Sequence, residues 1–312
     1  MSHPMLELDG LVRCFDEVRA VDNVSFSADR GQVLGFIGHN GAGKTTTMRI
    51  LATLDAPHSG DARIGGYSVV DAPEEVRRIT GFMPDYAGVY AHTTVTEYLD
   101  FFARAHDLEG DARRKAVANI IEFMGIGELA DRDVESLSKG LKQRVALGRA
   151  IIHDPQVLIL DEPAANLDPR ARIEFRTLIR ELAADGKTIL LSSHILTELA
   201  EMCDTVAVIE RGRILATGTV REILEGVRQR RVLSLRLAGA DERIERFLLE
   251  QPGIVNVHEA GGRLQFEFDG GDGDQVALIG RLIAAGFPVL EFSAHRAGLE
   301  DLFIEITEGP PQ

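Results

Sequence analysis

The sequence contains no apolar run that approaches the roughly 20 residues needed to span a bilayer. Its first ten residues, MSHPMLELDG, also lack the basic region and apolar stretch of a secretory signal. Internal repeats and low-complexity tracts are missing as well. From these absences we expect a chain that is neither exported nor inserted into a membrane.

The sequence has few cysteines and no net positive charge. The two cysteines, Cys14 and Cys203, are far apart and form no metal-ligand or redox spacing, which suits a reducing compartment. The formal net charge is −15 at pH 7, whereas proteins that bind phosphate backbones need clustered Lys and Arg. The composition therefore indicates a cytoplasmic protein and argues against a partner that is a nucleic acid.

Apolar residues are plentiful and follow two different patterns. The 312 residues are enough for one large and one smaller domain, and an apolar content of 45% can form a sizeable core. The segments LELDGLVRCF and AVDNVSFSA alternate in polarity, as half-buried antiparallel strands do. The unbroken runs QVLGFIG, QVLILDEP and KTILLSSH are typical of strands buried on both faces of a mostly parallel sheet. The predicted fold class is therefore α/β.

The patterns also predict two domains. The residues from about 82 to 150 indicate helices, because TVTEYLDFFARAHDL opens with the capping pair Thr94 and Glu97 and DARRKAVANIIEFMGI has apolar residues three and four apart. We expect them to form a helical insert within a domain spanning residues 1–225. Residues 231–308 follow the order strand, helix, strand, strand, helix, strand, helix, which predicts a small α+β domain of ferredoxin-like order.

The segment GHNGAGKTT predicts a nucleotide site. It matches the phosphate-loop pattern G-x-x-x-x-G-K-[ST] at Gly38, Gly43, Lys44 and Thr45, between a buried strand and a helix. In such loops backbone N–H groups surround a β-phosphate, Lys44 contributes a positive charge, and the Thr45 hydroxyl ligates Mg²⁺. A chance Gly-rich turn is the alternative, and the strand–loop–helix context argues against it.

The segment VLILDEP places two acidic residues at the carboxyl end of a buried strand, where ligands bind in open α/β sheets. Asp161 is suited to a Mg²⁺ shell, and Glu162 to accepting a proton from an attacking water. A simple acidic cap would be the better interpretation of an isolated Asp-Glu pair, but the phosphate loop favours the catalytic one.

A second phosphate site is predicted by SLSKGLKQRVALGRA. Residues Ser138 to Gly140 lie at the start of an expected helix, where free backbone N–H groups and the helix dipole attract anions. Taken with LLSSH and the motifs above, this segment resembles the signature of the nucleotide-binding subunits of ABC transporters, and the resemblance covers about residues 5–225.

The resemblance implies a P-loop cassette with a mostly parallel core sheet, an antiparallel β subdomain and a helical insert. In that family two cassettes pack head to tail, and each ATP lies between the phosphate loop of one and the signature helix of the other. The implied cofactors are ATP and Mg²⁺. The implied partners are a second copy of the chain and an integral-membrane permease, which would hold the chain at the inner face of the cell membrane.

The resemblance also assigns site residues. Phe15 stands where the family stacks an aromatic ring on adenine, although a Phe in a strand is more often core. His194 stands where a histidine contacts the γ-phosphate, and Asp168 stands in the loop that crosses the dimer interface, where it is also suited to cap a helix. The implied Mg²⁺ ligands are Thr45, Asp85 and Asp161, and the implied catalytic residues are Glu162, His194 and Asp85. The implied ATP contacts are Phe15, Gly38, Asn40, Gly41, Gly43, Lys44, Thr45, Thr46, Ser138, Gly140 and Asp168.

Four positions depart from the family pattern, and one of them is Asn166, which stands where a small residue is common. Lys139 and Leu141 replace the third and fifth residues of a signature that usually reads Leu-Ser-Gly-Gly-Gln. Asp85 replaces the glutamine between the core and the helical insert. We expect its carboxylate to ligate Mg²⁺ by oxygen, with an outward-facing cap on the hinge as the alternative.

The implied function is the ATPase subunit of an exporter of the drug-resistance and antibiotic-export branch. The alternative is an ABC ATPase that acts on ribosomes or DNA, but such proteins carry two cassettes or long coiled coils, and this sequence has neither. A small GTPase or kinase would need a guanine-reading motif or a lid, which the segment NLDP does not provide. Residues 231–308 suit either a regulatory module or a brace for the dimer.

Overall fold

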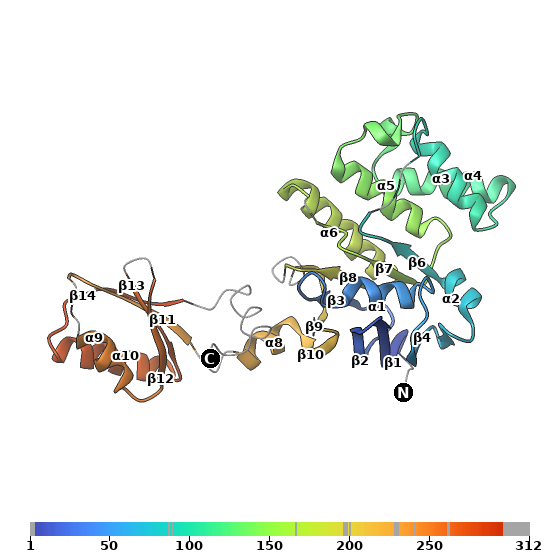
Figure 1. Cartoon of the computed structure of the whole chain (residues 1–312). Helices are drawn as coiled ribbons and strands as arrows, with labels where there is room; N and C mark the ends of the chain where they lie inside the picture. The colour runs from blue at the N-terminus through green and yellow to red at the C-terminus, as the bar shows by residue number, and fades with distance from the viewer. Residues whose placement is uncertain are drawn as a thin grey trace. The chain divides into compact units, whose positions relative to one another are not determined.

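The computed structural model describes residues 4–86, 88, 90–165, 167–195, 199, 201–227, 231–239, 241, 243–260 and 263–295 (Figure 1). The chain divides into two compact units, Met1–Val220 and Arg221–Gln312. Every helix in the described part of the chain is too short or too polar to cross a membrane.

A six-stranded sheet forms the centre of the first unit, with strand order β10-β9-β3-β8-β7-β6. All neighbouring strands pair in parallel except β9 and β10, which form an antiparallel hairpin. Every residue of β3, β7 and β8 is buried, as is typical of a parallel sheet that is covered on both faces. The strands are β3 (Val33–Ile37), β6 (Thr80–Met83), β7 (Val157–Leu160), β8 (Thr188–Ser193), β9 (Thr205–Glu210) and β10 (Arg213–Thr219). The prediction of an α/β fold with a mostly parallel sheet is confirmed.

A second, antiparallel sheet has the strand order β2-β1-β4-β5. It consists of β1 (Leu6–Phe15), β2 (Val18–Ala28), β4 (Ser59–Ile64) and β5 (Tyr67–Ser68), followed by helix α2 (Pro73–Ile79). One apolar core joins Leu8 of β1, Phe36 of β3 and Met48 of helix α1 (Lys44–Leu51). The helix that follows the phosphate loop is therefore packed against both sheets, which fixes the position of the loop.

Among the described residues, this unit also has four longer helices: α3 (Val95–Ala105), α4 (Gly110–Phe123), α5 (Lys139–Ile151) and α6 (Pro169–Ala184), with 3₁₀ turns at Gly127–Leu129 and Val134–Ser136. The capping box predicted at the start of α3 is present. The Glu97 N–H donates to Thr94 Oγ1 at 3.2 Å, and the Thr94 N–H donates to Glu97 Oε2 at 2.8 Å. The Thr94 N–H and the Thr94 hydroxyl both donate to the Glu97 carboxylate, which lowers the pKa of Glu97.

The second unit has its own core, which includes Leu233, Leu248, Phe266, Leu278 and Leu282. After α8 (Val220–Val227), its elements are β11 (Arg231–Leu237), α9 (Arg243–Leu249), β12 (Ile254–Ala260), β13 (Arg263–Phe268), α10 (Asp272–Ala284) and β14 (Val289–His295). The antiparallel sheet order β12-β13-β11-β14 is the predicted ferredoxin-like one. The helix expected after β14 falls on residues outside the described part of the chain.

Two histidines stack where the helical insert meets the core of the first unit. The rings of His106, which follows α3, and His153, which follows α5, have centroids 3.7 Å apart and planes at 4°. His153 Nε2 lies 3.2 Å from the carbonyl oxygen of Thr80, while its Nδ1 is buried without a hydrogen-bond partner. Burial, and then the neighbouring His106, lower the pKa of His153 to about 4.

This pair predicts a loss of stability in acid. An unfolded histidine titrates near pH 6.5, so the unfolded chain binds the His153 proton first as the pH falls. The free energy of unfolding is therefore unaffected by protonation of His153 above about pH 7, and it declines by up to about 3 kcal/mol between roughly pH 6.5 and pH 4. His153→Gln keeps a donor for Thr80 but does not titrate, so its urea midpoint should fall less between pH 7 and pH 5 than that of the unmodified protein. Equal declines would contradict this account.

Candidate functional site

The phosphate loop lies between β3 and α1 and is held closely against two other strands. A Cβ on Gly43, which has φ +109°, would lie 2.3 Å from the carbonyl oxygen of Ala20 in β2. A Cβ on Gly38 would lie 2.4 Å from the carbonyl oxygen of Ile209 in β9. Because neither position has room for a side chain, the loop can follow this path only with glycine there.

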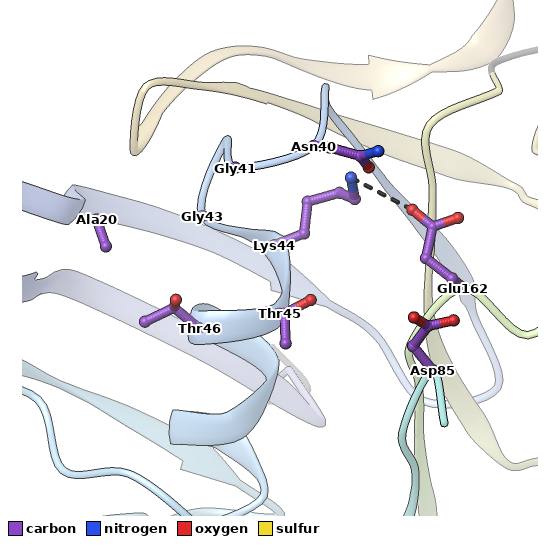
Figure 2. A pocket seen from close by; sticks show the side chains of 9 residues that line it. All are labelled: Ala20, Asn40, Gly41, Gly43, Lys44, Thr45, Thr46, Asp85 and Glu162. Carbon is purple, nitrogen blue, oxygen red and sulfur yellow. Dashed lines mark ion pairs between the residues drawn. The ribbon is translucent and has the colours of Figure 1, made fainter. Parts of the chain in front are cut away.

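A pocket of about 190 Å³ opens at this loop (Figure 2). Its lining residues are Ala20, Asn40, Gly41, Gly43, Lys44, Thr45, Thr46, Asp85 and Glu162. The acidic members come from distant parts of the sequence, since Asp85 follows β6 and Glu162 follows β7. The carboxyl ends of these parallel strands meet at one edge of the sheet, which brings the carboxylates to the phosphate loop.

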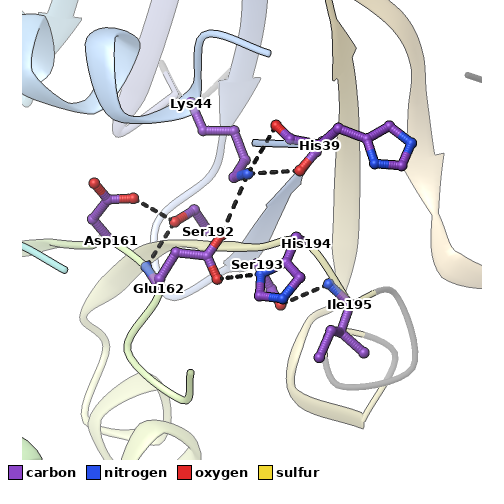
Figure 3. A network of polar contacts seen from close by, with 9 residues as sticks. His39, Lys44, Asp161, Glu162, Ser192, Ser193, His194 and Ile195 are labelled. Carbon is purple, nitrogen blue, oxygen red and sulfur yellow. Dashed lines mark hydrogen bonds and ion pairs between the residues drawn. The ribbon is translucent and has the colours of Figure 1, made fainter. Parts of the chain in front are cut away.

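Lys44 is 5% exposed and stands at the centre of the polar contacts in Figure 3. Its Nζ donates to the carbonyl oxygen of Gly38 at 2.6 Å and to that of His39 at 3.3 Å. It also lies 3.3 Å from Glu162 Oε1, an oxygen that is buried and accepts no hydrogen bond. Lys44 and Glu162 therefore attract each other through charge rather than through an aligned hydrogen bond.

Glu162 is held from two more directions. Its Oε2 lies 2.9 Å from Nδ1 of His194. Its backbone has φ +48°, a strained value for a residue other than glycine, and its N–H donates to Ser192 Oγ at 2.8 Å. The Ser192 hydroxyl in turn donates to Asp161 Oδ1 at 2.7 Å. Ser192 was not among the predicted site residues; its place two residues before His194 was the only signal for it in the sequence.

Asp161 is 1% exposed, and its environment favours a cation. Burial raises the pKa of Asp161, hydrogen bonds from the hydroxyls of Ser192 and Thr45 oppose this, and the charges of Glu162 and Asp85 raise it further. No three His, Cys, Asp or Glu side chains among the described residues are arranged to hold a metal ion by themselves. Mg²⁺ usually takes only one or two carboxylates together with phosphate oxygens, so Asp161 and Thr45 fit that ion when a nucleotide is present.

Asp85 is exposed and lines the pocket, close enough for its charge to influence the pKa of Asp161.

The residue expected at the adenine, Phe15, is not part of the pocket lining. Its ring lies at the end of β1 and is 46% exposed, which does not suit a core side chain. Arg13 covers one face of this ring.

The signature residues lie in a second pocket, of about 160 Å³, lined by Ser138, Gly140, Leu141, Arg144, Asp168, Arg170, Ala171 and Glu174. Ser138 caps α5 and Asp168 caps α6, since each side chain accepts a hydrogen bond from the backbone N–H three residues on. A Cβ on Gly140 would lie 3.1 Å from Cβ of Ala171, so the two helix starts are in close contact. The two pockets share no lining residue.

Comparison with known proteins gives two family matches. The family described as ABC transporter matches residues 21–165, and the family described as ATP-binding protein DrrA1-3-like, C-terminal domain, matches residues 218–307. The daunorubicin/doxorubicin resistance ATP-binding protein DrrA of Streptomyces peucetius is 34% identical over 98% of this chain and 93% of its own length. The Nod factor export ATP-binding protein I of Ralstonia nicotianae is 34% identical over 98% and 94%.

Solved structures show the same similarity over 71–73% of the chain. An ATP-binding subunit of an ABC transporter is 32% identical with a TM-score of 0.65, covering 71% of this chain and 92% of that one. The protein cbiO1 of Clostridium perfringens, part of the ABC transporter complex cbiONQ, is 29% identical with a TM-score of 0.65, covering 73% and 94%.

Proposed function

The chain belongs to the ABC transporter family as an ATP-binding subunit with ATPase activity, and we propose that it dimerises head to tail around two ATP molecules to drive a separate membrane permease. Its relatives are named for resistance and export, which supports an exporter. The alternative, an ATPase acting on ribosomes or DNA, is not favoured because these relatives are transport proteins.

The observation that carries the dimer proposal is the separation of the two pockets. The phosphate loop, Asp85 and Glu162 line one pocket, while Ser138, Gly140 and Asp168 line another. These separate linings support a site in which the signature that contacts the γ-phosphate is contributed by a second copy of the chain. In that arrangement Asp168 keeps its role as a helix cap and also faces the partner.

Within the first pocket, each side chain has a proposed role. Lys44 neutralises charge on the β- and γ-phosphates, and Glu162 accepts a proton from the attacking water. His194, already hydrogen-bonded to Glu162, orients that carboxylate and contacts the γ-phosphate. Thr45, Asp161 and Asp85 are the proposed ligands of Mg²⁺, which when bound offsets the negative charge of the phosphates.

The proposed place of the protein is the cytoplasmic face of the membrane, where the permease would hold it. We also propose that residues 1–225 form the cassette, with the insert at about 82–150, and that residues 231–308 form the smaller domain. The separate apolar core around Leu233 and Phe266 supports this division.

Mixing two inactive variants tests whether Ser138 acts in the partner's site. Lys44→Ala damages the phosphate loop, and Ser138→Arg places a bulky side chain in the second pocket. Each variant should hydrolyse ATP at under about 1% of the unmodified rate, because both sites of each homodimer are damaged. In a mixture, heterodimers have one site with both halves intact, so part of the activity should return.

Ser136→Arg is the matched control, since Ser136 is exposed, lies two residues before Ser138 and does not line the second pocket. It should retain most of the activity. Full activity of Ser138→Arg on its own would contradict the proposed dimer.

Asp85→Asn tests the proposed contact with Mg²⁺. The substitution removes one negative charge beside Asp161, so the Mg²⁺ concentration for half-maximal ATP hydrolysis should rise by about two- to fivefold. Asp71→Asn makes the same chemical change at an exposed residue outside the pocket and should leave the Mg²⁺ titration unchanged. Equal titrations for both variants would show that Asp85 acts only as a cap on the hinge.

A further inference from the structure

Two residues of β1 form a stacked pair at the end of the hairpin with β2. Arg13 and Phe15 are two positions apart, and their side chains meet although the pairing of β1 with β2 is irregular between Arg13 and Cys14. The guanidinium carbon of Arg13 lies 4.8 Å from the centroid of the Phe15 ring. This distance is within the range of a cation–π contact, in which the positive charge is attracted to the face of the ring.

The Arg13 side chain is fixed by a contact on its other side. Its Nη1 donates to the carbonyl oxygen of Ala56 at 2.8 Å, in the loop that joins α1 to β4. Its Nε is buried and has no hydrogen-bond partner. Arg19, on the neighbouring strand, instead forms an ion pair with Asp22. Arg13 is thus anchored on the backbone that follows the phosphate-loop helix while its charge faces an aromatic ring.

The ring lies close to the nucleotide pocket. Phe15 pairs with Val18, and Ala20, two residues farther along β2, lines the pocket and packs against Gly43. At about 3.3 Å per residue, Val18, the strand partner of Phe15, and Ala20 are roughly 7 Å apart along β2. A nucleotide whose phosphates contact Lys44 can therefore place its base near Phe15, whose side chain is partly exposed.

We propose that Arg13 is a positioning residue for the base of ATP: its guanidinium holds the Phe15 ring in one plane from one side and leaves the opposite face for adenine. The cation also draws electron density of the ring toward itself, and an aromatic ring with a fixed plane loses less freedom when a base stacks on it. This inference rests on the proposed function and on a contact between Phe15 and adenine, which the resemblance to ABC transporter subunits implies.

The test compares Arg13→Met, Phe15→Ala and the double variant in full-length protein. Arg13→Met has a side chain of similar length without the charge. It should raise the KM for ATP by about two- to fivefold while kcat changes by less than about twofold. Phe15→Ala should raise the KM by about tenfold, because it removes the stacking surface. In the Phe15→Ala background, Arg13→Met should have no further effect.

Inorganic tripolyphosphate separates the base from the phosphates. Its inhibition constant should be the same for the unmodified protein and for Arg13→Met. Arg13→Lys, which keeps a charge over the ring, should restore part of the affinity for ATP. Arg19→Met removes the same charge from the hairpin and leaves Asp22 paired with Arg213, so it should not change the KM.

The outcomes are distinguishable. If Arg13→Met weakens the binding of tripolyphosphate and of ATP equally, Arg13 does not work through the ring and the inference is wrong. The same holds if Arg13→Met raises the KM for ATP as much in the Phe15→Ala background as in the unmodified protein. If Phe15→Ala leaves the KM unchanged, the proposed contact between Phe15 and adenine is wrong, although ATP hydrolysis at Lys44 and Glu162 would stand.

Discussion

Replacing Glu162 with glutamine is expected to slow ATP hydrolysis by about 10²- to 10⁴-fold and to leave ATP binding intact. The amide cannot accept the proton of an attacking water. It keeps the size of the side chain and the backbone bond to Ser192, so the strained turn after β7 should persist. Lys44 and His194 both contact the Glu162 carboxylate. In the variant they would no longer face its negative charge, but they should keep their positions.

The measurement is the single-turnover rate with bound ATP, together with the dissociation constant for ATP. Glu181→Gln makes the same chemical change at an exposed position of α6 and should hydrolyse ATP at the unmodified rate. A Glu162→Gln protein that retains more than about a third of the normal rate would rule out Glu162 as the base.

The Lys44→Ala substitution should reduce the affinity for ATP by at least about 100-fold, because the buried ammonium is the positive charge at the phosphate loop. The substitution also leaves the buried Glu162 carboxylate and the Gly38 carbonyl without this partner. Some loss of stability is therefore expected, and the thermal midpoint must be measured alongside the affinity.

Lys115→Ala is the matched control, since Lys115 is exposed in α4 and lies outside both pockets. It should bind ATP with unchanged affinity by calorimetry. If a folded Lys44→Ala protein bound ATP as tightly as the unmodified chain, the phosphate loop would not be the nucleotide site.

The parts of the fold that follow from local patterns were predictable. Fully apolar runs identified β3, β7 and β8, the capping pair at Thr94 identified the start of α3, and the alternation of strands and helices gave the ferredoxin-like order. In contrast, the pairing of β1 with β4 left no signal in either segment, since alternation shows which face of a strand is buried but not which strand lies beside it.

For the site, too, the sequence predicts local motifs but not the contacts between distant residues. The motifs predicted Lys44, Asp161 and Glu162, because the spacing of glycines and the acidic strand end are local features. The hydroxyl of Ser192 between two carboxylates and the guanidinium of Arg13 on Phe15 are contacts made in three dimensions by ordinary-looking residues. Such contacts depend on strand register and loop path, which one sequence does not specify.

The molar mass of Glu162→Gln in solution tests the central claim most directly. Because ATP remains bound but is hydrolysed slowly, the closed dimer should accumulate. Light scattering should give the monomer mass without nucleotide and twice that mass with saturating ATP and Mg²⁺, and a further Ser138→Arg substitution should return the mass to that of the monomer. A Glu162→Gln protein that binds ATP and Mg²⁺ yet stays a monomer at every concentration tested would contradict the head-to-tail dimer.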